Sequence, residues 1–188
     1  MDKCLLMCYN LSINYESIAE DMPFSLLPKV MTPELTDLTQ EFFRNRGISL
    51  VMLDFDNTIV PYTTSTPTAE MDRWLREMVQ SDLTLCVVSN SKKDRVKIFC
   101  EGYGISCITH ASKPSTKGLI QCMTLFDTQP GAAAMVGDQI FTDTLAGNMA
   151  GVTTILVKAI DNHNFWLKAR HVLEKPFIYL SRKRRLQQ

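Results

Sequence analysis

Four acidic side chains of this sequence follow closely on two apolar runs. They are Asp54 and Asp56, after residues 50–53, and Asp138 and Asp143, after residues 133–136. Aspartate is disfavoured in strands and its charge is costly to bury, so acids at such places need a compensating cation. Carboxylates, a backbone carbonyl and waters are the hard oxygen ligands that Mg²⁺ prefers. These acids therefore predict a magnesium site.

Groups that can bind an anion follow two further apolar runs. Ser89 and Asn90 come directly after residues 83–88, and Lys113 follows a shorter run near 105–109. Taken one at a time, such residues also have ordinary structural explanations. A serine or an aspartate can cap a helix or form a local turn, and a loop lysine is most often solvated. Here, however, four successive strand ends carry acids, a hydroxyl, a lysine and further acids. This combination favours catalysis.

These groups need elements that place them together, and apolar strands do alternate with amphipathic helices along the chain. The predicted strands are residues 49–53, 83–88, 105–109, 133–136 and 153–157. The predicted helices are residues 33–46, 67–78, 92–101, 115–126 and 142–150. This alternation predicts an α/β fold in which helices cover both faces of a parallel sheet. In such sheets, functional residues gather at the carboxyl ends of the strands.

The motifs at these strand ends resemble the four ordered motifs of the haloacid-dehalogenase (HAD) superfamily of phosphohydrolases. The motifs are DFDNT at 54–58, Ser89-Asn90, Lys113, and Gly137-Asp138 with Asp143. The phrases VSNSKKDRV, SKPSTKG and VGDQIFTDTLAGNMAG are similar to the capless subclass IIIA branch called YqeG-like, related to mitochondrial phosphatidylglycerophosphatase. The resemblance runs from about residue 25 to 177. It implies a Rossmann-like three-layer sandwich with a central parallel sheet and no cap domain.

The resemblance also implies catalytic roles. Asp54 would be the nucleophile that forms an aspartyl-phosphate, and Asp56 the general acid and base. Two alternate positions of an extended chain are about 6 to 7 Å apart and point to the same side, so one phosphate can meet both carboxylates. Lys113 would supply a second positive charge, and Ser89 and Asn90 would bind phosphate oxygens.

The same resemblance assigns the metal ligands and one bracing residue. Mg²⁺ would offset the repulsion between a phosphate monoester and the ionised nucleophile. Its ligands would be the Asp54 carboxylate, the Asp56 backbone carbonyl and the Asp138 carboxylate, with Asp143 supporting ligand waters or holding Lys113. Thr58 would brace the loop that carries Asp56 and would belong to the phosphate-binding residues.

The spacing between the motifs bears on the substrate. The gaps at residues 59–66 and 91–112 are too short for a cap domain. An open site suits a macromolecule or a lipid head group, and the nearer resemblance favours hydrolysis of phosphatidylglycerophosphate to phosphatidylglycerol. Phosphoproteins, sugar phosphates and nucleotides are alternative substrates, because the fold and motifs fix the reaction better than the leaving group.

Two non-enzymatic classes are also possible for such a pattern. A phosphoacceptor receiver domain uses aspartate and magnesium, but its lysine follows the fifth strand, whereas Lys113 follows the third predicted strand here. A HAD-like scaffold that only binds partners could lose its acids, yet Asp54 and Asp56 are both present. Both observations favour an enzyme.

The composition limits the classes of partner and the cellular compartment that we expect. Twenty basic and twenty acidic residues balance, so no nucleic-acid partner is expected. A chain of 188 residues with 45% hydrophobic content fits a single domain over 1–188, with residues 1–30 as an N-terminal extension. The first residues form too short an apolar run for a secretory or membrane-spanning segment, and the six cysteines lie in patterns typical of reduced thiols. A cytoplasmic protein is predicted.

The charge pattern is uneven only near the C-terminus. The basic residues there are Lys168, Arg170, Lys175, Arg182, Lys183, Arg184 and Arg185. Such an end is most often solvated. Aromatic and apolar residues such as Trp166 and Phe177 are interleaved with these charges, which is typical of a segment at a lipid interface. The tail at 168–188 is therefore predicted to make peripheral contact with anionic membranes.

Overall fold

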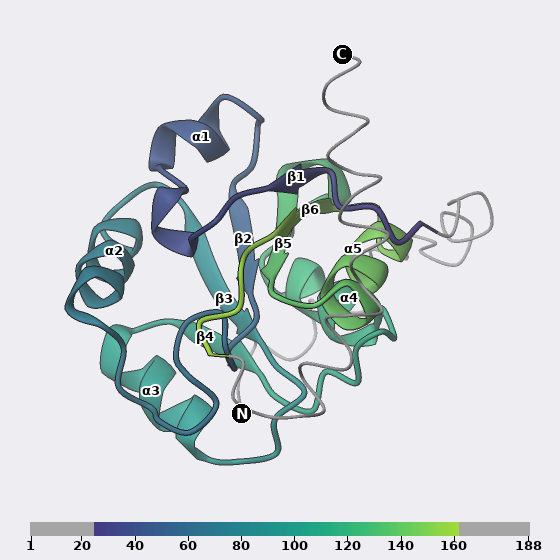
Figure 1. The fold of residues 1–188 in the computed structure, drawn as a ribbon. Coiled ribbons are helices and arrows are strands. Elements are labelled where there is room, and N and C mark those ends of the chain that lie inside the picture. The colour runs from purple at the N-terminus through teal and green to yellow at the C-terminus, as the bar shows by residue number, and fades with distance from the viewer. Residues whose placement is uncertain (1–24, 162–188) are drawn as a thin grey trace, which may run out of the picture.

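The computed structural model describes residues 25–161, which form one parallel sheet with helices on both faces (Figure 1). The strands are β1 (Val30–Met31), β2 (Leu50–Leu53), β3 (Thr84–Val88), β4 (Ser106–Ile108), β5 (Ala133–Gly137) and β6 (Thr153–Leu156). Their order is β1-β6-β5-β2-β3-β4, and every neighbouring pair is parallel. The helices are α1 (Gln40–Arg44), α2 (Ala69–Val79), α3 (Arg95–Tyr103), α4 (Lys117–Leu125) and α5 (Leu145–Met149). The predicted α/β fold is confirmed.

Strand β2 lies between β3 and β5 and joins the two halves of the hydrophobic core. Its alternate residues Val51 and Leu53 pack with buried residues of α1, α2 and α3. Leu50 and Met52 pack on the opposite face with buried residues of α4 and α5. All four side chains have no exposed surface. A strand that is covered on both faces needs apolar residues at every position, which explains the unbroken run before Asp54.

Helix α2 shows why a helix could be predicted from the sequence at this place. Thr68 caps it, because its hydroxyl accepts a hydrogen bond from the Met71 N–H at 3.2 Å. Its buried face includes Trp74, whose indole N–H donates to the Leu38 carbonyl at 2.8 Å. The predicted start at Pro67 is two residues early, a difference within the usual uncertainty of helix ends.

The predicted helix from Pro33 to residue 46 is wrong. Instead the segment contains a 3₁₀ turn at Leu35–Asp37 and the short helix α1, for which Thr39 is the N-cap. The Asp37 carboxylate accepts hydrogen bonds from the Thr32 hydroxyl at 2.9 Å and the Glu34 N–H at 3.0 Å. Such bonds from short polar side chains compete with a continuous helix.

The edge of the sheet was also missed. Strand β1 pairs with β6 through the register Val30–Ile155 and Met31–Leu156. A strand of two residues is too short to show a period in the sequence. Its pairing places the start of the described chain beside β6, the last strand in chain order among residues 25–161.

The remaining predicted elements are present, with shifted ends. The helix expected at 142–150 is α5 preceded by one π-helical turn, Ile140–Thr144. Between β2 and α2, and between β3 and β4, the chain forms loops and α3 alone. The described residues therefore carry no cap domain at either place, as predicted.

Several predictions concern the ends of the chain. Residues 1–24 and the basic tail at 168–188 lie outside the described residues, so the single domain over 1–188 and the membrane contact of the tail stay predictions. Among residues 25–161, no helix is long and apolar enough to cross a membrane.

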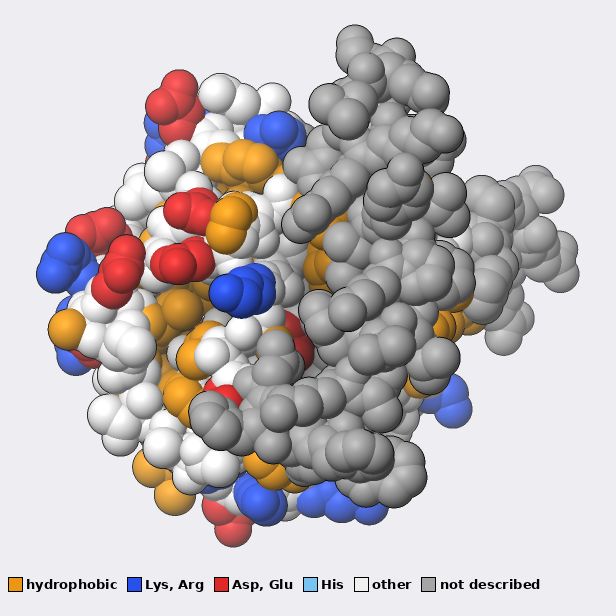
Figure 2. All heavy atoms as spheres, in the orientation of Figure 1, with side chains coloured by type: hydrophobic (Ala, Val, Ile, Leu, Met, Phe, Trp, Pro, Cys, Tyr) orange, Lys and Arg blue, Asp and Glu red, His pale blue; other side chains and the backbone are white. Residues whose placement is uncertain are grey.

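Cys86, Cys100, Cys107 and Cys122 are free thiols. Acidic and basic side chains both lie on the described part of the face in Figure 2, in keeping with the balanced composition.

Candidate active site

The carboxyl ends of β2, β3 and β5 meet at one edge of the sheet and form a pocket of about 490 Å³. Asp54 lies one residue past β2, where its N–H donates to the Val136 carbonyl at 2.9 Å and so extends the strand pairing. Ser89 holds the same position past β3, with its N–H on the Ile108 carbonyl at 2.9 Å. The sheet itself therefore fixes where these two side chains begin.

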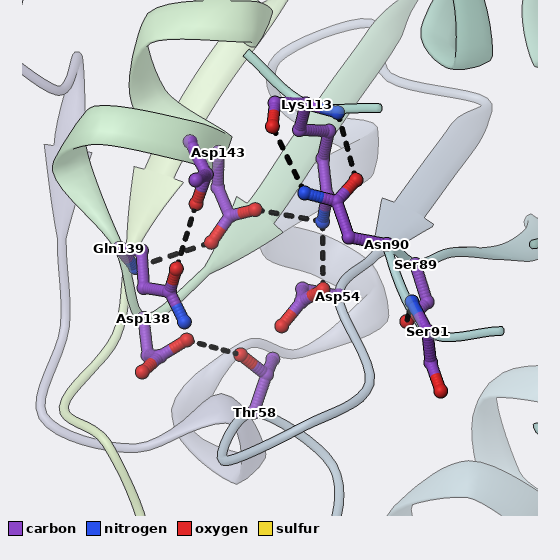
Figure 3. A network of polar contacts seen from close by, with 10 residues as sticks. Asp54, Thr58, Ser89, Asn90, Ser91, Lys113, Asp138, Gln139 and Asp143 are labelled. Carbon is purple, nitrogen blue, oxygen red and sulfur yellow. Dashed lines mark hydrogen bonds and ion pairs between the residues drawn. The ribbon is translucent and has the colours of Figure 1, made fainter. Parts of the chain in front are cut away.

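Lys113 joins two acids at the base of the pocket (Figure 3). Its Nζ lies 2.6 Å from Asp54 Oδ1 and 2.7 Å from Asp143 Oδ1, and all three side chains are buried. Burial alone lowers the pKa of Lys113, but attraction by Asp143 and Asp54 outweighs it, and the net shift is upward. Lys113 is therefore a permanent cation between two carboxylates.

The main chain of Lys113 is held by Asn90. The Asn90 side chain accepts a hydrogen bond from the Lys113 N–H at 2.7 Å and donates one to the Lys113 carbonyl at 2.9 Å (Figure 3). The Asn90 side chain thus positions Lys113, and the predicted contact of the Asn90 amide with phosphate stays a prediction. A phosphate contact from Asn90 is left to its main-chain N–H.

Asp143 is placed by the π-helical turn and by Gly137. Its second oxygen, Oδ2, accepts a hydrogen bond from the Gln139 N–H at 3.1 Å. Burial raises the pKa of Asp143 to about 6, although the Lys113 charge and the hydrogen bond from Gln139 oppose this shift. A Cβ atom on Gly137 would overlap the Asp143 carboxylate, so glycine is required for this close approach.

Substitution Gly137→Ala is therefore expected to displace Asp143, to lower kcat, and to reduce stability by about 1 to 3 kcal/mol, the usual cost of overpacking. Gly131→Ala is the matched control, because a Cβ there meets no atom within 4 Å. Thermal denaturation and phosphate release measured on both variants check this expectation. Equal behaviour of the two variants would contradict the proposed contact.

Three carboxylates of the pocket form a candidate metal site. One oxygen from each of Asp54, Asp138 and Asp143 can be chosen so that all three lie within 4.8 Å of one another. Lys113 supplies one positive charge against these three negative ones. The donor set and the excess negative charge suit a hard divalent cation such as Mg²⁺. The structure thus brings together three of the four acids predicted for the metal.

Asp56 lies apart from that cluster. Its carboxylate forms an ion pair with the Arg95 guanidinium, which agrees with a metal contact predicted for its backbone carbonyl and not for its side chain. Arg95 Nη1 also donates to the Thr64 carbonyl at 2.6 Å, and its guanidinium lies 5.2 Å from the centre of the Phe55 ring. Partial burial lowers the pKa of Arg95. These contacts fix Arg95 beside Asp56.

Arg95 is a site residue that was not predicted from the sequence. It lies within KKDR, a run that looks like a solvated helix start, and its partner is 39 residues away along the chain. The only signal was its position shortly after Ser89-Asn90, on the strand end that contributes to the pocket. Its guanidinium holds the Asp56 carboxylate in place, so Arg95 is a positioning residue.

Ser89 and Thr58 complete the predicted set. Ser89 is buried, lines the pocket, and its Oγ accepts a hydrogen bond from the Ser91 N–H at 3.1 Å. Thr58 Oγ1 lies 3.5 Å from Asp138 Oδ1 (Figure 3). Thr58 therefore lies beside a predicted metal ligand, and its contact with phosphate stays a prediction.

Comparison of sequences identifies relatives of this chain. The family model described as mitochondrial PGP phosphatase matches residues 17–160. The probable phosphatase YqeG of Bacillus subtilis (strain 168) is 32% identical over 131 residues, which cover 70% of this chain and 76% of that relative. Residues 17–160, which the family model matches, contain every site residue described above.

Two solved structures share the fold at a TM-score of 0.51 each. An uncharacterized protein from Listeria monocytogenes serotype 4b is 17% identical, and the match covers 63% of this chain and 84% of that one. The hypothetical protein XCC2798 from Xanthomonas campestris is 12% identical, with 74% and 79% covered. At such low identity the likeness concerns the fold alone.

Proposed function

Because the chain belongs to the mitochondrial PGP phosphatase family of HAD-type phosphoric monoester hydrolases, we propose that it converts phosphatidylglycerophosphate to phosphatidylglycerol through an aspartyl-phosphate on Asp54. One observation carries the proposal. Lys113 binds Oδ1 of Asp54 at 2.6 Å and is itself shared with Asp143. This contact fixes the carboxylate and leaves Oδ2 as the oxygen for attack on phosphorus.

Asp54 and Asp56 divide the chemistry between them. In the first step, Asp54 Oδ2 forms a bond to phosphorus while the bond to the leaving oxygen breaks, and Asp56 gives that oxygen a proton. In the second step, Asp56 takes a proton from water, which attacks phosphorus and releases Asp54. The Arg95 guanidinium favours the ionised form of Asp56, which suits the second step, and disfavours the protonated form that the first step requires.

The other pocket residues bind and orient. Ser89 and the main-chain N–H of Asn90 are proposed to hold phosphate oxygens, with Lys113 as the nearby cation. Mg²⁺, held by Asp54, Asp138, the Asp56 carbonyl and, through water, Asp143, would supply charge neutralisation at the phosphate. The close grouping of the three carboxylates supports this assignment.

We expect Mg²⁺-dependent phosphate release from micellar phosphatidylglycerophosphate, and less from a phosphopeptide, a sugar phosphate or a nucleotide. A chelator should stop the reaction, and added Mg²⁺ should restore it. A release assay over this panel, with and without Mg²⁺, checks both expectations.

Thermal denaturation separates metal binding from turnover. A ligand that binds only the folded state at 100 times its Kd stabilises it by about 2.7 kcal/mol. Mg²⁺ should therefore raise the Tm of the native chain, and this shift should shrink in Asp138→Asn. Undiminished activity in the chelator would contradict the metal assignment, and preference for another panel member would replace the lipid substrate.

The setting of the reaction is part of the proposal. A lipid-borne phosphate requires that the pocket reach a bilayer surface, and contact of the basic tail at 168–188 with anionic lipid would serve this purpose. A cytoplasmic protein that binds membranes peripherally fits such a substrate. The balanced overall charge gives no reason to expect a nucleic-acid partner.

A further inference from the structure

Basic side chains gather on one side of the pocket. Lys92, Lys93 and Arg95 line it, and all three come from the segment between β3 and the first turn of α3. The two lysines are exposed, and Lys93 Nζ lies 5.6 Å from the centre of the Tyr62 ring, which also lines the pocket. We call Lys92 and Lys93 the basic rim.

The charges of the basic rim are not neutralised within the described structure. Arg95 forms an ion pair with Asp56, but no ion pair joins Lys92 or Lys93 to a carboxylate among residues 25–161. The neighbouring acid Asp94 is exposed and does not line the pocket. Two lysines at the mouth of the site are therefore available to a substrate.

The proposed chemistry decides which part of a substrate meets the basic rim. Asp54 attacks phosphorus on one side, and the leaving oxygen lies opposite, next to its proton donor Asp56. Asp56 contacts Arg95, and the rim lysines precede Arg95 by two and three residues. Arg95 and Lys93 lie 5.9 and 5.6 Å from the centre of the same Tyr62 ring, so the leaving alcohol is expected on the side of the pocket that carries the basic rim.

We propose that the basic rim selects phosphate monoesters whose leaving alcohol carries a second anionic group, such as a phosphodiester. This inference rests on the proposed function and adds a specificity determinant to it. Two ammonium groups at an open mouth attract such an anion, whereas a leaving alcohol without charge gains nothing from them. The recognised group is the phosphodiester itself, whether it belongs to a lipid or to a soluble head group.

Three substrates test the inference. Glycerol 3-phosphate has one phosphate, glycerophosphoglycerol phosphate has a soluble phosphodiester as well, and short-chain phosphatidylglycerophosphate in micelles has the same group on a lipid. The native chain should show a higher kcat/KM for both substrates with two phosphates. The double variant Lys92→Gln with Lys93→Gln should reduce this preference several-fold, mainly through KM, and added salt should reduce it in the native chain.

Lys97→Gln is the matched control. Lys97 is an exposed lysine of α3 that does not line the pocket, so the loss of its charge should leave the preference unchanged. The melting temperatures of all variants show that the fold is kept.

The outcomes separate the two proposals. No phosphate release from any of the three substrates would overturn the proposed function, and the role of the rim with it. Release without preference for a second anion, or an equal loss in Lys97→Gln, would overturn the role of the rim alone. An effect confined to micelles would also overturn it, because the lysines would then act on the lipid surface and not on the phosphodiester.

Discussion

Asp54→Asn is expected to lower kcat by more than about a thousandfold while the chain stays folded. An amide oxygen is not a competent nucleophile toward phosphorus, so the first bond cannot form. The fold should survive because Asn keeps an oxygen that can accept the Lys113 hydrogen bond, and Lys113 retains Asp143 as an ionic partner. Phosphate release and thermal denaturation measure the two effects separately.

Asp127→Asn is a suitable control for that variant. Asp127 is exposed and does not line the pocket, so the same chemical change there removes a charge without touching the site. Activity of a folded Asp54→Asn protein that equals the activity of this control would rule out an aspartyl-phosphate on Asp54.

The fold could be predicted from the sequence where burial is two-sided. Strands β2, β3 and β5 lie inside the sheet, and burial on both faces makes their sequences continuously apolar. The segment after Thr32 was predicted wrongly because its apolar spacing is helical, while the hydrogen bonds of Asp37 break the helix. Periodicity reports burial well, but it does not report such competing local bonds.

The site residues that follow strand ends could be predicted from the sequence. The sheet topology then brings together Asp54, Asp138 and Lys113, although Lys113 is 59 residues from Asp54. The pairing of Asp56 with Arg95 could not be predicted, because it depends on how α3 is oriented over the loop after β2. The contact between the Asn90 side chain and the Lys113 main chain could not be predicted either.

The arrangement separates two electrostatic tasks. At the base of the pocket, buried acids outnumber Lys113 and create a place for a divalent cation. At the mouth, Lys92 and Lys93 are exposed and basic. A substrate with a terminal monoester and a second anionic group would match both regions at once, since a divalent cation held at the base would face the monoester and the two lysines would face the second anion.

Lys113→Met is expected to have a large effect on both stability and activity. The substitution keeps an unbranched side chain of similar length but leaves the buried carboxylates of Asp54 and Asp143 without their cation. Removing one partner of a buried ion pair costs about 3 to 5 kcal/mol, because the remaining charge is uncompensated. Lys117→Met, an exposed change outside the pocket, should cost far less. Urea denaturation in metal-free buffer measures the difference.

A double-mutant cycle then tests the cause of the loss. If uncompensated charge is responsible, adding Asp143→Asn to Lys113→Met removes one of the two stranded carboxylates and should recover part of the lost stability. In the presence of Lys113, Asp143→Asn instead removes an ion pair and should destabilise the chain. The same change would thus act in opposite directions in the two backgrounds. Additive effects would mean that Lys113 stabilises the fold through packing of its stem, and that the charge network at the base of the pocket serves the reaction alone.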